Sequence, residues 1–171
     1  MQHHFHIIFS FGFGILDAET IVNMAKLWKN VPEKMECKVS GSKQSFGSRS
    51  RSGNSLTIGE NDIHELVFRS HCNITSLEHV QVVVNIDHPS RGQLEVLLVS
   101  PAGTKTHLLS PRPNDLSSKG FQDWVLTSVE TWGENGDGEW HLYFVSRGGP
   151  GVQWNVGHCH LILIDKICLH N

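Results

Sequence analysis

The feature that most constrains the fold is a hydrophobic period of two residues, which begins near Ile63. Successive side chains of a β-strand point to opposite faces, so this period predicts strands with one buried face. The apolar positions are Val80, Val82, Val84 and Ile86, then Leu94, Val96 and Leu98, then Trp124 and Leu126, then Trp140, Leu142 and Phe144, and finally Leu161 and Leu163. A chain with this pattern is expected to be mainly β.

Turn signals separate these runs and indicate how the strands are joined. They lie at residues 88–92, 100–103, 111–114 and 135–138, and each contains Pro or Gly. Short strands joined in this way, with no helical pattern between them, are typical of antiparallel sandwiches and barrels. We therefore expect an antiparallel, jelly-roll-like β-sandwich.

One short N-terminal helix is expected ahead of the strands. Asp17 is a suitable N-cap, and the pattern predicts a helix from there to Lys29, stopped by Pro32. The apolar positions at helical spacing are Ile21, Met24, Ala25 and Trp28. Residues 40–59, which are rich in Ser, Gly and Arg, are expected to form a linker or a long surface loop.

Composition excludes several classes of protein. Apolar residues make up 39% and charged residues 18%, which is a globular composition. The net charge is -3 and the basic residues are scattered, so no nucleic-acid partner is expected. No apolar run reaches the roughly 18 residues of a membrane span. Residues 1–8 lack the basic region and the cleavage site of a signal peptide, so neither a transmembrane segment nor a signal peptide is expected in this chain.

No local signature marks a catalytic residue. The chain lacks a Gly-x-Ser-x-Gly elbow, and the Asp/His neighbours Asp62-Ile63-His64 and Asp87-His88 are better explained as loop or strand-edge features. A calcium loop at 134–139 lacks the usual ligand spacing. On a strand, His158 and His160 would share a face while Cys159 points away, which leaves too few ligands for zinc. We expect no catalytic residue and no metal site.

Two further features have competing interpretations. Trp124, Trp132 and Trp140 could form a sugar-binding or base-stacking face, but core packing is favoured, since Trp124 and Trp140 lie in phase with the other apolar residues of their strands. Arg91-Gly92-Gln93 differs by one residue from an integrin-binding tripeptide, and Gln93 removes the carboxylate that such recognition would use. We expect this segment to be a turn that leads into a strand.

A set of motifs in one register carries a family resemblance. In order and spacing they resemble the P domain (Homo B domain) of the furin/kexin proprotein convertases. The motifs are Ser76-Leu77-Glu78-His79-Val80, Arg91-Gly92-x-Leu94, Leu98-x-Ser100-Pro101-x-Gly103-Thr104, Leu108-Leu109, Arg112-Pro113-x-Asp115, Gly120-Phe121-x-x-Trp124, Trp132-Gly133-Glu134 and Gly138-x-Trp140-x-Leu142.

The N-terminal part extends the resemblance. Residues 11–19, the helix to Trp28 and Val31-Pro32 resemble the closing helix of the convertase catalytic domain. In that family a cysteine after this helix pairs with one at the start of the P domain. Cys37 and Cys72 occupy those places, so the resemblance implies a disulfide between them. It also divides the chain into a remnant of a subtilisin-like catalytic domain at 1–36, a linker or loop at 37–62 and a P-domain sandwich at 63–171.

The resemblance implies a calcium-dependent serine endopeptidase of the secretory pathway that cuts precursors after paired basic residues. It places the catalytic triad and the calcium ligands in the catalytic domain upstream, none of whose motifs is present in this chain. The chain alone is therefore expected to be inactive and to hold no cofactor. Its implied role is to pack on the catalytic domain within one protein and to support folding and regulation of that domain.

Two alternatives stay open, and each has a structural signature. A free-standing secreted β-sandwich that binds a protein or a glycan would have a polar surface all round, whereas a convertase fragment would expose an apolar face. A hydrolase with an unrecognised active site would bring a Ser and a His within hydrogen-bonding distance.

Some residues depart from the family pattern. Gln93 stands where most relatives have Asp, and neither Cys159 nor Cys168 matches a paired position of the family. Residues 165–171 also differ from the usual continuation, which makes a truncated gene product a natural hypothesis. Asn73-Ile74-Thr75 is a single candidate glycosylation sequon, which matters only in a secretory protein.

Overall fold

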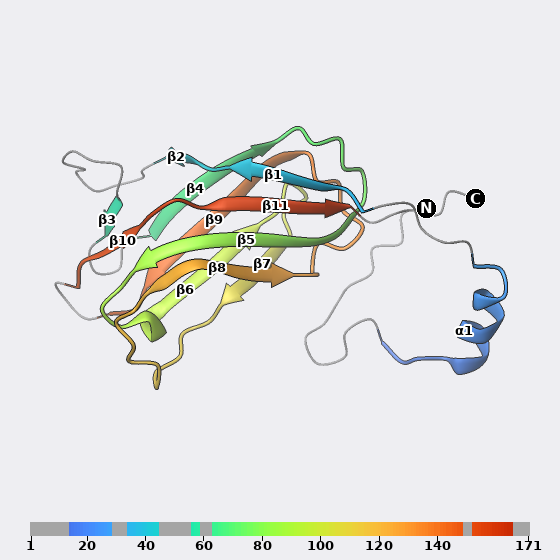
Figure 1. Ribbon diagram of the computed structural model, residues 1–171, viewed down its shortest axis with the longest axis horizontal. Coiled ribbons are helices and arrows are strands. Elements are labelled where there is room, and N and C mark those ends of the chain that lie inside the picture. The colour runs from blue at the N-terminus through green and yellow to red at the C-terminus, as the bar shows by residue number, and fades with distance from the viewer. Residues whose placement is uncertain (1–13, 29–33, 45–55, 59–62, 149–151, 166–171) are drawn as a thin grey trace.

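Two antiparallel β-sheets pack face to face in the computed structural model of the chain (Figure 1). The structure describes residues 14–28, 34–44, 56–58, 63–148 and 152–165. The first sheet has the order β1 (Glu36–Ser40), β11 (His160–Asp165), β5 (Leu77–Asp87), β10 (Trp154–Val156) and β3 (Leu56–Ile58), with β8 (Phe121–Ser128) also paired to β5. The second has the order β2 (Ser42–Gln44), β4 (Ile63–Ser70), β9 (Gly138–Ser146), β6 (Leu94–Val99) and β7 (Lys105–Leu109). This confirms the predicted sandwich.

The core lies between the sheets and consists of the side chains that the period of two selects. A strand buried on one face contributes every second residue to the core. Those positions on β5, β6, β9 and β11 are at most 1% exposed: Val80, Val82, Val84, Ile86, Leu94, Val96, Leu98, Trp140, Leu142, Phe144, Leu161 and Leu163. The alternation therefore predicted the inward face of these four strands correctly.

Trp124 is the exception, because it is 48% exposed rather than buried. Its partner in the register is Val84, an inward-facing residue, so the predicted phase of the strand is right. However, among the strands that the structure describes, β8 pairs with β5 alone and so forms an edge of its sheet. At this edge the opposite sheet covers Trp124 incompletely, and the prediction that it packs in the core is wrong.

The expected linker contributes strands instead of a loop wherever the structure describes it. β1 pairs along its whole length with β11, from Glu36 opposite Ile164 to Ser40 opposite His160. Its alternate residues Cys37 and Val39 are half-buried against the core. β2 pairs with β4, and β3 pairs with β10. Residues 45–55 and 59–62 of the expected loop lie outside the described residues.

The N-terminal helix α1 spans Ala18–Ala25. The Asp17 carboxylate accepts hydrogen bonds from the N–H groups of Glu19 and Thr20, which confirms the predicted N-cap. The helix ends earlier than predicted because the last turn tightens: the N–H of Leu27 donates to the carbonyl of Met24, three residues back. Lys29 and Pro32 lie outside the described residues.

Candidate functional site

At one end of the sandwich, the loop that precedes β8 folds around the carboxylate of Asp115. The Arg91 guanidinium donates to both carboxylate oxygens, at 3.1 and 2.9 Å, and Arg112 donates to one of them at 3.1 Å. The guanidinium carbons of the two arginines lie 5.5 and 5.7 Å from the ring centre of Phe121, within the range of a cation–π contact. The family motif around Arg91 and Phe121 is thus a single cluster centred on Asp115.

The charge state of Asp115 follows from this cluster. Burial alone would raise the pKa of the Asp115 carboxyl, but the hydrogen bonds from Arg91 and Arg112 outweigh burial and lower its pKa below the ordinary value. Because Arg91 is held by this carboxylate, it does not project into solvent as an integrin-binding arginine would. Arg91–Gln93 instead forms a single 3-10 turn that leads into β6, as the sequence predicted.

Two glycines let the backbone come close to this cluster. A Cβ on Gly92 would lie 2.2 Å from the carbonyl oxygen of Arg112 and 2.4 Å from that of Asp115. A Cβ on Gly120 would lie 2.1 Å from the carbonyl oxygen of Ile86. Gly120 also has φ +61°, in the left-handed region that side chains disfavour. A residue with a side chain would therefore not fit at either position unless the backbone moved.

A second group of motif residues lies at the opposite, C-terminal end of β6. In the turn Ser100-Pro101-Ala102-Gly103, the Ser100 hydroxyl oxygen accepts a hydrogen bond from the N–H of Thr104. The Thr104 hydroxyl in turn donates to the Glu134 carboxylate. The backbone of the Trp132-Gly133-Glu134 segment bonds Leu77 twice, because Gly133 donates to its carbonyl and Glu134 accepts from its N–H. The motif thus ties this turn to the loop between β8 and β9.

A disulfide joins Cys37 on β1 to Cys72 after β4, which is the pairing that the resemblance implies. Next to it, Asp137 accepts hydrogen bonds from the backbone N–H groups of Cys72 and Asn73, at 2.7 and 3.0 Å. Sequence reasoning missed this role of Asp137, although the turn signal at 135–138 marked its position. Cys159 is buried in the core cluster, and Cys168 lies outside the described residues.

A buried Ser–His pair exists, but the hydrogen bond between the two side chains runs in the wrong direction for catalysis. His88 Nε2 lies 3.1 Å from Ser146 Oγ, and both residues are at most 2% exposed. His88 Nδ1 accepts the N–H of Ser90, so Nε2 carries the ring proton and donates it to the serine. A general base must instead accept the serine proton. This pair therefore does not support a hydrolase. Asp62, the acid of the Asp62-Ile63-His64 segment considered in the sequence, lies outside the described residues.

The buried His88 predicts a pH dependence of stability. Burial lowers the pKa of His88 below its ordinary value, although the N–H of Ser90 acts in the opposite direction. The unfolded chain binds a proton near pH 6.5 and the folded chain does so only at lower pH. Stability is therefore expected to fall as pH drops below about 6.5. Urea midpoints at pH 7.5 and 5.5 measure this loss.

A pair of substitutions separates His88 from the other histidines. Replacing His88 with Gln is expected to flatten the pH dependence, because the amide can donate and accept without titrating. The matched control is His107→Gln, whose side chain is 51% exposed. If both variants retained the wild-type pH slope, His88 would not be the group responsible.

The residues weighed as metal ligands are used in other ways. Glu134 and Asp137 accept hydrogen bonds from protein donors, as described above. His158 and His160 have ring centres 4.1 Å apart and Cys159 is buried, but β11 begins only at His160, so His158 and Cys159 lie outside the strand that the prediction assumed. Within the described ranges, no three His, Cys, Asp or Glu side chains form a group that could hold a metal ion.

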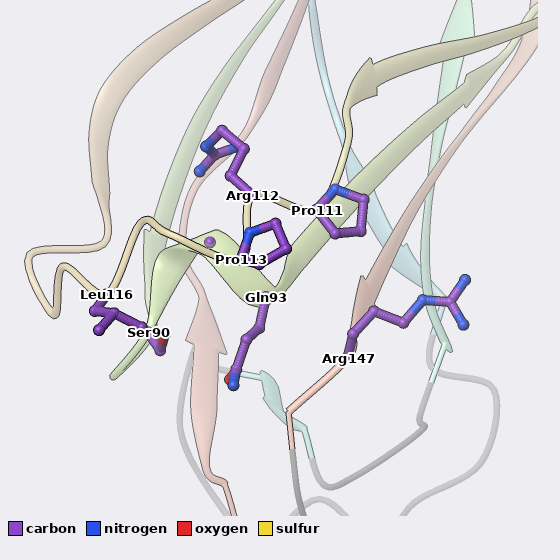
Figure 2. Close-up of a pocket in the computed structure, with 8 residues that line it drawn as sticks. Ser90, Gln93, Pro111, Arg112, Pro113, Leu116 and Arg147 are labelled. Carbon is purple, nitrogen blue, oxygen red and sulfur yellow. The ribbon is translucent and has the colours of Figure 1, made fainter.

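A cavity of about 270 Å³ opens beside the Asp115 cluster. Figure 2 shows Arg112 and Arg147 extending in different directions on either side of Gln93. Arg112 is engaged by Asp115, and Arg147 binds the Glu95 carboxylate at 2.7 Å. The remaining lining of the cavity includes Pro111, Pro113, Leu116 and Gln93.

Several exposed apolar side chains lie on and beside α1, which Figure 1 shows apart from the sandwich. None of its residues is buried. The exposed apolar side chains on α1 and its flanks are Ile15, Leu16, Ile21, Val22, Met24, Leu27 and Trp28. An exposed face of this kind is a candidate interaction surface. No helix among the described residues has the length and apolar character to cross a membrane.

Comparison with solved structures supports the fold. A serine protease from Aeromonas sobria, solved in complex with the chaperone ORF2, superposes with a TM-score of 0.61 and 21% identity. The match covers 92% of this chain and 31% of that protease. FlhE superposes with a TM-score of 0.52 and 11% identity, over 79% of this chain and 99% of FlhE. At these identities the likeness concerns the fold alone.

Sequence comparison is more specific. Proprotein convertase subtilisin/kexin type 5 of Branchiostoma californiense is 37% identical over 84% of this chain and 8% of that protein. Proprotein convertase subtilisin/kexin type 6 of Homo sapiens is 39% identical over 77% of this chain and 13% of that protein. Neuroendocrine convertase 2 of Homo sapiens is 41% identical over 77% of this chain and 20% of that protein.

The chain thus spans a fifth or less of the length of these relatives. The profile described as Proprotein convertase P-domain matches residues 77–154, which include both loop clusters and most of the core strands. Residues 77–154 therefore form a P domain of the kind found in the subtilisin/kexin family of proprotein convertases.

Proposed function

We propose that this chain acts as the accessory part of a convertase, packing against the catalytic domain through α1 and supporting its folding and regulation. The observation that carries the proposal is the uncovered apolar face of α1. Ile21, Met24 and Trp28 recur at helical spacing and are 47–61% exposed. Such a face is stabilised when another surface covers it.

The other face of α1 is polar, which gives the helix an orientation. Glu19, Asn23 and Lys26 follow a second stripe at helical spacing, and the Lys26 ammonium donates to the Asn23 side chain at 3.2 Å. A helix of eight residues is marginal in water by itself, because nucleation is costly and few hydrogen bonds follow. Packing of the apolar stripe is therefore what would hold α1 in place.

In this proposal, the convertase catalytic domain covers the apolar stripe of α1. The segment resembles the closing helix of that domain, and it is covalently joined to a P domain. A free-standing binding module would bury these side chains or replace them with polar ones. The hydrogen bond between His88 and Ser146 runs in the wrong direction for catalysis, so this pair does not support the hydrolase alternative.

For the complete protein we propose calcium-dependent cleavage of precursors after paired basic residues, in the secretory pathway. The catalytic domain would hold the triad and the calcium. The Cys37–Cys72 disulfide supports this location, since disulfides persist in oxidising compartments and are rare in the cytosol.

A chimaera tests the role of α1. The chain replaces the corresponding region of human Neuroendocrine convertase 2, and Ile21 and Met24 are changed to Asp. We expect loss of the secreted enzyme and loss of calcium-dependent turnover of a fluorogenic peptide with paired basic residues, because two carboxylates would be buried at the interface. Turnover per molecule of secreted protein separates a folding defect from a catalytic one.

The matched control changes Asn23 to Asp on the polar face of the same helix. This variant adds a charge that stays in water, so secretion and turnover are expected to equal those of the unmodified chimaera. Equal secretion by the apolar-face and polar-face variants would contradict the proposal.

A further inference from the structure

The loop between β4 and β5 presents Asn73 to solvent. Asn73 has φ +58° and is exposed, and its backbone N–H donates to the Asp137 carboxylate. Asn tolerates this left-handed conformation better than most residues. Among the described residues, no hydrogen bond uses its side-chain amide. The backbone is therefore held in place while the side chain stays available.

The two neighbours of Asn73 complete a modification motif in the folded loop. Ile74 is 1% exposed and packs in the core cluster, which anchors the loop. Thr75 is exposed, so the two polar side chains of Asn73-Ile74-Thr75 both face water. A folded domain can carry a glycan at such an Asn without displacing any core side chain.

The disulfide supplies an independent argument about the compartment. Cys72, the residue before Asn73, is bonded to Cys37. Disulfides form in the secretory pathway, where Asn-x-Thr sequons are also modified. The sequon and the disulfide thus point to the same place of folding, which is the location that the proposed function assumes.

The geometry points to N-linked glycosylation at Asn73. The glycan would be attached directly after Cys72, beside the Cys37–Cys72 disulfide. It follows that the catalytic domain, when it covers α1, leaves the 71–75 loop open.

Translation of the full chain behind a cleavable signal peptide, with endoplasmic-reticulum microsomes, tests the site. We expect a single slower-migrating species that endoglycosidase treatment removes. Thr75→Ala and Asn73→Asp should each abolish it, and Thr75→Ser should retain it because serine also completes the motif. Asp is chosen because it, too, tolerates the left-handed conformation of residue 73.

An unshifted chain, in microsomes that glycosylate a standard acceptor protein, would overturn the inference. A shift that survives Thr75→Ala would overturn it as well. Since the signal peptide is supplied, the result does not depend on packing against a catalytic domain. That interaction is tested by the α1 variants, which leave the sequon intact.

Discussion

Replacing Gly120 with alanine is expected to lower the free energy of unfolding by roughly 2–5 kcal/mol, through two costs that add. The left-handed φ of +61° disfavours a side chain by about 1–2 kcal/mol. Placing a Cβ 2.1 Å from the carbonyl oxygen of Ile86 forces backbone movement, which costs roughly 1–3 kcal/mol in packed regions. Ile86 belongs to β5, which pairs with β8, β10 and β11, so the strand has little freedom to move.

Gly133→Ala is the matched control, since it isolates the first cost. Gly133 has φ +81°, but a Cβ there would meet no atom within 4 Å. This variant should lose only about 1–2 kcal/mol. Urea unfolding of both variants and the wild type measures the difference. If both variants lost the same free energy of unfolding, the close approach to Ile86 would contribute nothing to the destabilisation.

Loss of the disulfide is the second large effect. The double substitution Cys37→Ser and Cys72→Ser opens a loop with a sequence separation of 35 residues. In the chain-entropy description, closing such a loop stabilises the folded state by roughly 3–4 kcal/mol, because it restricts the unfolded chain. The double variant is therefore expected to unfold at a distinctly lower urea concentration than the wild type.

Reduction of the wild type provides the control for this experiment. Dithiothreitol should lower the urea midpoint of the wild type towards that of the double variant and leave the double variant unchanged. A double variant as stable as the oxidised wild type would show that β1 stays paired without the bond. A further loss upon reduction of the double variant would point to a second disulfide.

The sequence predicted the parts of the fold that local periodicity encodes. Every second residue from Val80 to Ile86 and from Trp140 to Phe144 lies on the inner face of its sheet, as the period of two predicts. The N-cap at Asp17 could likewise be predicted, because a cap and the N–H groups that it binds are neighbours in the chain.

What could not be predicted depends on which strands are neighbours in space. The phase of Trp124 was right, yet nothing in its strand indicates that β8 forms an edge. Glu36–Ser40 is short and followed by a polar run, and only its pairing with β11, near the other end of the chain, makes it a strand. The contact between His88 and Ser146 likewise joins residues far apart in sequence.

The pairing of β1 with β11 has a mechanical consequence. Because the pair is antiparallel, Glu36 lies opposite Ile164, so the chain enters the sandwich beside the point where it leaves. Tension between these two points would separate the strands one residue pair at a time, starting there. The opening would stop at Cys37, whose bond to Cys72 passes the load to β4 and β5 in the interior of the sandwich. The disulfide thus sets the resistance of the sandwich to tension between these two points.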